Sequence, residues 1–118
     1  MKESQITTTQ CANMLTAIGD ALYVIGGKWK LRVIVALREE SKRFNEIQRT
    51  VEGISARVLS AELKELEMNG FVKRTVHHKQ TPVMVEYQLT EYADTLSEVL
   101  QSLANWGILH REKLRRER

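Results

Sequence analysis

The sequence has very few of the residues that mark secreted, membrane or loop-rich proteins. Its single cysteine, Cys11, cannot close an internal disulfide, so nothing favours an oxidising compartment. No apolar run approaches the ~18–20 residues that span a bilayer. The N-terminal stretch MKESQITTTQ lacks the apolar centre of a signal peptide. We therefore expect a cytoplasmic protein with no membrane association.

One proline and no low-complexity stretch leave no internal boundary, which predicts one domain over residues 11–118 after a flexible tail, residues 1–10. The chain has 118 residues, 42% of them hydrophobic, which suffices for one core. Its net charge is +3. Lys and Arg gather in residues 28–49 and 110–118, whereas all charged residues between 88 and 109 are acidic. Such segregation suits an anionic partner, although scattered solvated faces explain the charge equally well.

Hydrophobic periodicity predicts a mainly helical chain with one β-hairpin, in the α+β class. A short helix joined by a tight turn to a second helix indicates a helix-turn-helix, and a hairpin directly after it makes the winged version. The same order could belong to another small α+β core. The predicted helices cover residues 11–25, about 28–37, 45–51, 55–69 and 90–116, and the strands cover 71–77 and 84–89.

The helix predicted over residues 55–69 has clear ends and two distinct sides. Ser55 is a good N-cap, and Asn69-Gly70 is a typical helix end. One side carries a stripe of leucines with helical spacing, which predicts burial. The stripe consists of Leu59, Leu63 and Leu66.

The opposite side of that helix has the residues expected of a helix that reads DNA. Small residues allow a close approach to a major groove, and Arg57 can pair with guanine acceptors. Ser60 could contact a base or a phosphate, and Lys64 a phosphate. The simpler alternative is an amphipathic helix with a solvated face. The candidate residues are Ser55, Ala56, Arg57, Ser60 and Lys64.

Further candidates for DNA contact lie outside this helix. Arg43 and Asn45 begin the short helix, whose free amides favour phosphate, and Lys28 precedes the second helix. A polar hairpin tip suits a minor groove or flanking phosphates. The tip residues are His78, Lys79, Gln80 and Thr81.

No catalytic or cofactor motif appears in the sequence. There is no Gly-rich phosphate loop and no His-Glu metal motif, and the paired histidines 77 and 78 lack further ligands nearby. Cys11 with a histidine could be imagined as a nucleophile pair, but nothing holds the two together. We expect neither an enzyme nor a bound metal or cofactor.

Four segments resemble the HxlR-type transcriptional regulators. They are VIGGKWKLRVIVAL at 24–37, RFNEIQRTVEGISARVLSAELKELEMNGFVKRTV at 43–76, VEYQLTEYADTL at 85–96 and LANWG at 103–107. The resemblance implies a bacterial or archaeal winged helix-turn-helix regulator that binds a pseudo-palindromic operator as a homodimer. It places the recognition helix from about Ser55 and the wing over residues 71–89.

The resemblance also implies that the N- and C-terminal helices, residues 11–25 and 90–116, form the dimer interface. Some family members sense oxidants through an N-terminal cysteine nearer the Gly-Gly pair, where Thr16 stands here; Cys11 is a candidate sensor that departs from this pattern. Response to a small molecule or stress signal is compatible with the family, and no residue set declares an effector. The rival interpretation is a winged-helix protein-interaction module without specific DNA binding. The candidate interface residues are Leu15, Ile18, Leu22, Leu96, Val99, Leu100, Leu103 and Trp106.

Overall fold

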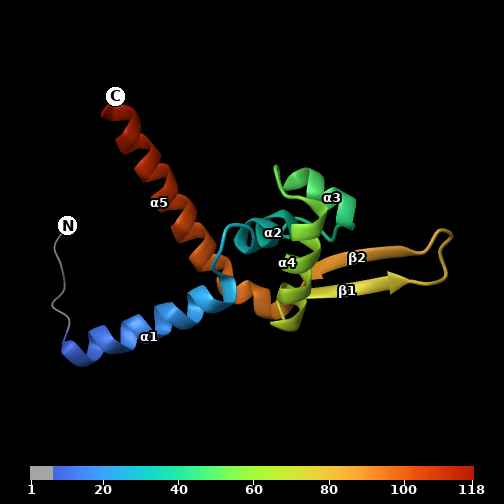
Figure 1. Ribbon diagram of the computed structural model, residues 1–118, viewed down its shortest axis with the longest axis horizontal. Coiled ribbons are helices and arrows are strands. Elements are labelled where there is room, and N and C mark those ends of the chain that lie inside the picture. The colour runs from blue at the N-terminus through green and yellow to red at the C-terminus, as the bar shows by residue number, and fades with distance from the viewer. Residues whose placement is uncertain (1–6) are drawn as a thin grey trace.

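The computed structural model describes residues 7–118 and confirms the winged helix-turn-helix arrangement (Figure 1). Residues 1–6 of the predicted N-terminal tail lie outside the described residues. In chain order the elements are α1 (Thr8–Ile25), α2 (Lys30–Leu37), α3 (Phe44–Thr50), α4 (Ala56–Met68), β1 (Val72–His77), β2 (Met84–Leu89), the 3-10 helix η1 (Glu91–Leu96) and α5 (Ser97–Arg116).

Helix α1 begins at Thr8, three residues before the predicted start at Cys11, so the end of the predicted flexible tail at residue 10 was wrong. The reason is a reciprocal cap. The Thr7 hydroxyl accepts a hydrogen bond from the Gln10 amide at 3.0 Å, and the Gln10 side chain accepts one from the Thr7 amide at 2.8 Å. These bonds satisfy amides that a helix start otherwise leaves unpaired. The polar composition of this stretch concealed the cap.

Helix α4 has the predicted ends. The Ser55 hydroxyl accepts a hydrogen bond from the Val58 amide at 3.1 Å. At the other end Gly70 has a φ of +83°, a left-handed conformation that glycine adopts without steric cost. The amides of Gly70 and Phe71 then donate to two carbonyls of the last helical turn, at 3.1 and 2.9 Å. These bonds turn the chain directly into strand β1.

The core lies where α2, α3 and α4 meet the base of the hairpin and the start of the C-terminal helix. The leucine stripe of α4 is buried as predicted. It packs with apolar side chains of the neighbouring elements. Among the most deeply buried are Val33, Ile34, Ile47, Leu59 and Leu66.

Strands β1 and β2 pair antiparallel from Val72 opposite Leu89 to His77 opposite Met84. An isolated bridge adds Lys42 beside Tyr87, where the two residues exchange backbone hydrogen bonds of 3.0 and 2.8 Å. The segment between α2 and α3 therefore holds the base of the wing, which the periodicity did not predict. Figure 1 shows the distal part of the hairpin projecting beyond the helices.

The C-terminal helix predicted over residues 90–116 is divided into η1 and α5. Thr90 does not cap a helix with its side chain; its hydroxyl donates to the carbonyl of Gly70 instead. This bond ties the end of β2 to the end of α4. Beyond the core, α1 and α5 extend from the body as two diverging arms (Figure 1).

Candidate nucleic-acid interface

The side of α4 opposite the leucine stripe is open to solvent. All five residues predicted there, from Ser55 to Lys64, are exposed. Arg57, Ser60 and Lys64 follow at helical spacing, so their side chains share one face. The Ser55 hydroxyl is already engaged in the cap, so this residue has less freedom to bind a base. The face combines one bidentate donor, one hydroxyl and one ammonium.

The start of α3 differs from its prediction in its electrostatics. The helix begins at Phe44, and the Arg43 amide donates to the Glu46 carboxylate at 2.8 Å. This bond holds the pKa of Glu46 below its ordinary range, so the group is anionic near neutral pH. The Arg43 amide, which we predicted to be free to bind phosphate, therefore already has a hydrogen-bond acceptor within the chain. The exposed side chains of Arg43 and Asn45 remain available here for contact with a phosphate.

The returning side of the wing, from Gln80 into β2, faces the start of α3 across a surface hollow. Residues 78–81 are all exposed, and the chain turns there with a hydrogen bond from the Gln80 amide to the His77 carbonyl. Arg43 and Asn45 line one surface hollow with Gln80 and Thr81. The structure thus brings these two predicted groups together. Arg49 of α3, which the sequence interpretation did not select, lines the same hollow and adds a positive charge to it.

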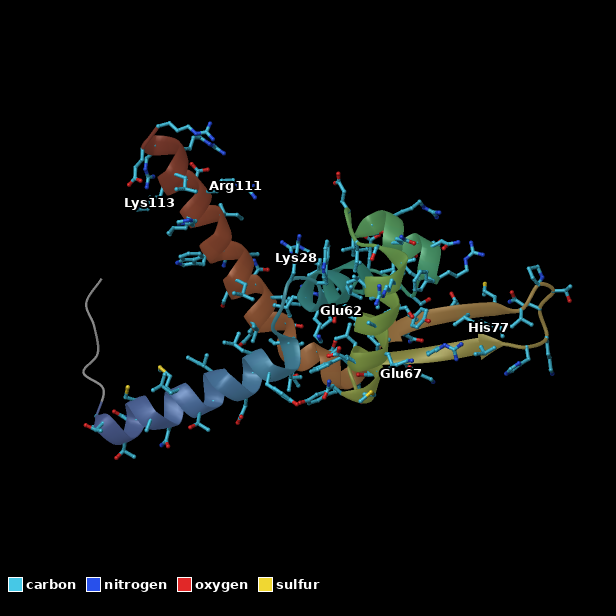
Figure 2. All side chains as sticks on the ribbon, in the orientation of Figure 1. Lys28, Glu62, Glu67, His77, Arg111 and Lys113 are labelled. Atoms are coloured by element: carbon cyan, nitrogen blue, oxygen red, sulfur yellow. The ribbon has the colours of Figure 1, made fainter. Side chains whose placement is uncertain are left out.

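Lys28 does not join this group. Its ammonium lies 4.8 Å from the centre of the Trp29 ring, a cation–π distance, and Arg32 lies over the same ring. Lys28 lines a cleft between α2 and α5 together with Leu103. Figure 2 shows it on the side away from the wing. The Gly26-Gly27 turn carries the side chain toward α5, which the position before a helix could not reveal.

Two acids of α4 turn away from the exposed face toward a buried lysine. The Lys30 ammonium lies 2.8 Å from Glu62 and 3.0 Å from Glu65, and only 11% of its side chain is exposed. Figure 2 shows Glu62 at the junction of α4 with α2. Lys30 itself was not selected from the sequence, where it is one of several alternating bases.

Across residues 7–118 no three His, Cys, Asp or Glu side chains come together in a way that could hold a metal ion. None of the described helices has the length and apolarity that crossing a membrane requires.

Comparison with known proteins agrees with this geometry. A family model described as HxlR-like helix-turn-helix matches residues 24–115. An HTH-type transcriptional regulator of Halalkalibacterium halodurans is 45% identical over 94 residues, or 79% of this chain and 82% of that protein. The regulator YybR of Bacillus subtilis is 43% identical over 79% of this chain and 74% of its own. The redox regulator HypR in its reduced form superposes with a TM-score of 0.77 at 40% identity, covering 84% of this chain and 97% of that one.

The chain belongs to the HxlR-like helix-turn-helix family. It is therefore a DNA-binding transcriptional regulator built on a winged helix. The family match begins at residue 24, after most of α1, and includes both α4 and the wing.

In this HxlR-like regulator α1 leaves its apolar side uncovered. No residue of α1 is buried, and the predicted interface residues Leu15, Ile18 and Leu22 are all exposed. Met14 and Tyr23, which the sequence interpretation did not select, are exposed as well. An isolated helix of this length is only marginally stable in water, and Val24 and Ile25 at the end of α1 pack against the core.

The C-terminal candidates divide into two groups. Leu96 and Leu100 are buried in the core of the single chain, at 9% and 8% exposure, so little of either side chain is available for contact with a second copy. Both lie where η1 passes into α5, against the α2–α4 core. Val99, Leu103 and Trp106 are exposed along α5. The Trp106 ring stacks on His110 at 5.0 Å, which holds it along the helix.

Cys11 is exposed on α1 of this HxlR-like regulator. The sequence places no Lys or Arg between Lys2 and Lys28, so the helix that carries Cys11 has no cation of its own.

Proposed function

We propose that the protein is a homodimer that reads a pseudo-palindromic operator, with α4 of each copy in a major groove. The observation that carries this proposal is the exposed face of α4, which presents Arg57, Ser60 and Lys64 while the leucine stripe holds the helix in the core. An α-helix with small residues on its outer face fits the ~12 Å width of a major groove.

The residues of this face divide the work of binding. Arg57 stands in the first turn, where recognition helices contact base edges, and can bond two guanine acceptors at once. Ser60 adds a second base contact. Lys64, one turn farther along, binds the phosphate backbone, which positions the helix without specifying sequence.

The α3 start and the wing supply the flanking contacts. Arg43 and Asn45 bind a phosphate beside the groove that α4 occupies, and Arg49 strengthens the field there. The tip residues His78 to Thr81 reach the neighbouring groove. The shared hollow of α3 and the wing supports this assignment, because one DNA strand could follow both elements. Lys28 takes no part, since it lines the cleft toward α5.

Two copies joined through α1 and α5 would place their recognition helices one DNA turn apart, about 34–36 Å. The exposed apolar side chains of both arms support this pairing. Such a DNA-bound dimer is expected in the cytoplasm.

The testing experiment measures binding to duplex from the upstream region of the protein's own gene against random duplex, across a salt series. Preference for the upstream duplex with a steep salt slope supports an operator-reading dimer. Equal affinity for both duplexes contradicts sequence-specific reading. Binding to neither at low salt indicates the alternative, a protein-interaction module without specific DNA binding.

A further inference from the structure

Lys30 is the only charged residue that is buried among residues 7–118, and both of its partners belong to the helix that meets DNA. It is 9% exposed. Its ammonium makes short contacts to Glu62 at 2.8 Å and Glu65 at 3.0 Å. Lysines are almost never buried unless they are paired. We refer to Lys30, Glu62 and Glu65 as the α2–α4 clamp.

The clamp restricts rotation of α4 about its own axis, which the leucine stripe alone does not. Burial of Leu59, Leu63 and Leu66 decides which side of α4 faces inward, but apolar contact is non-directional and permits small rotations. The two carboxylates stand one helical turn apart and share one ammonium. Glu62 accepts a charge-assisted hydrogen bond, which is directional, and Glu65 forms a short ion pair. Rotating α4 about its axis would lengthen at least one of them.

Small rotations matter for base reading. Side-chain ends lie roughly 5–6 Å from the axis of a helix, so a rotation of about 20° moves them by roughly 2 Å. Hydrogen bonds tolerate only a few tenths of an ångström around 2.9 Å. A recognition helix rotated by this amount would lose a bidentate contact from Arg57, while contacts to the continuous phosphate backbone would adjust.

A contribution to stability alone does not explain the clamp, because desolvation offsets much of the gain from a buried ion pair. The clamp is also present at every ordinary pH. The hydrogen bond that the Lys30 ammonium donates to Glu62 raises the pKa of Lys30 above its ordinary value, against the opposing effect of burial. Its contribution is therefore complete below that value and is lost only as the pH rises through the raised pKa.

We propose that Lys30 is a positioning residue for DNA reading: through Glu62 and Glu65 it fixes the rotation of α4, and with it the sequence preference. This inference rests on the proposed operator-reading function. Removing the clamp should reduce the preference for the correct sequence far more than the affinity for DNA in general.

The test starts from sites that the wild type selects out of random duplexes and compares the dissociation constants for the selected and the random duplex. The main variant is K30M/E65Q, which breaks the clamp without changing net charge. We expect its ratio of random to selected constants to fall about tenfold, the order of one lost bidentate contact. K30R, which keeps the positive charge and can donate to both carboxylates, should stay within about threefold of the wild type. K113M removes one charge from an ion pair at the far end of α5 and should leave the ratio unchanged (Figure 2).

The outcomes separate the competing explanations. An unchanged ratio in folded K30M/E65Q overturns the inference, and so does equal weakening on both duplexes, which would indicate a merely structural role. If that variant does not fold, E65Q decides, because Glu65 is half exposed and Glu62 remains paired; its ratio must fall measurably or the inference is wrong. A wild type that selects no sequence contradicts the proposed function itself.

Discussion

At the scale of single residues, the exposed face of α4 brings close together side chains whose chemistry suits different contacts with DNA. Arg57 carries five donors in a rigid fork, whereas Lys64 carries a compact charge that any phosphate can meet. Sequence preference and general affinity should therefore respond to different substitutions.

Replacing Arg57 by alanine should relax sequence preference by about tenfold or more, because one bidentate base contact disappears. Replacing Lys64 by alanine should weaken binding to all sequences and reduce the salt slope by about one. Titrations of both variants on specific and random duplexes across salt provide the measurement. Equal losses on the two duplexes for both variants would show that this division of tasks is wrong.

Cys11 yields a second prediction at this scale. HypR is a redox regulator, but the sequence around Cys11 has no Lys or Arg between Lys2 and Lys28 of the kind that accompanies many reactive cysteines. We expect diamide treatment to leave DNA affinity within about twofold, a change well below a tenfold loss. C11S, which lacks the only thiol, is the control. A large loss in the treated wild type that C11S abolishes would establish a thiol switch.

At the scale of elements, local sequence signals predicted α4 well because its ends and its buried stripe are local. Ser55, the leucine spacing and Asn69-Gly70 each act within a turn of the helix. The same signals failed at residues 90–116, where Thr90 bonds to Gly70, twenty residues away in the chain, and the helix starts as a 3-10 turn. Apolar periodicity shows which side chains share a helix face, but it cannot show that Gly70 binds the hydroxyl that would otherwise cap the helix.

The candidate site shows the same limit. The bases and small residues of the α4 face follow from helical spacing. The burial of Lys30 does not, because it depends on α4 acids that lie 32 and 35 positions farther along the chain. Likewise Leu96 and Leu103 look equivalent in the apolar pattern of the C-terminal helix, and only packing against α2 and α4 separates core from surface.

The end of α4 can be tested through its left-handed glycine. G70A should destabilise the fold by about 1–2 kcal/mol, since a Cβ disfavours positive φ. Steric crowding is not the cause, because the added Cβ would lie 3.9 Å from Tyr92, an ordinary contact. Chemical denaturation gives the free energy of unfolding. G107A, in α5, where an added Cβ meets nothing within 4 Å, should instead stabilise that helix by up to about 1 kcal/mol.

At the scale of the whole molecule, the described chain combines a packed body with two helical arms. The body contains the core, α4 and the wing (Figure 1), whereas α1 and one side of α5 expose apolar side chains to solvent. Substitutions in the two parts should therefore differ in their dependence on protein concentration.

Ile18→Glu and Leu103→Glu should shift the protein from dimer to monomer, because each places a charge in an apolar contact between copies. Sedimentation equilibrium measures the dissociation constant. Val83→Glu makes the same kind of change at an exposed site on the wing and should leave association unaltered. Unchanged dimers in both arm variants would contradict the proposed interface.

Leu100→Ala provides the complementary prediction. Because Leu100 is buried within one chain, its truncation should lower the free energy of unfolding by about 2–5 kcal/mol. Melting curves at several concentrations should then show a loss that hardly varies with dilution, measured relative to the wild type. A loss that vanishes at high concentration would assign Leu100 to the contact between copies.

The absence of any buried residue in α1 has a consequence for how long each copy survives in the cell. An isolated helix of this length is only marginally stable in water, so an unpaired copy would present α1 largely unfolded to proteases. Pairing would remove that vulnerability by mass action. Newly made chains that find no mate would then be degraded sooner than paired ones, so that the lifetime of the regulator rises with its own abundance.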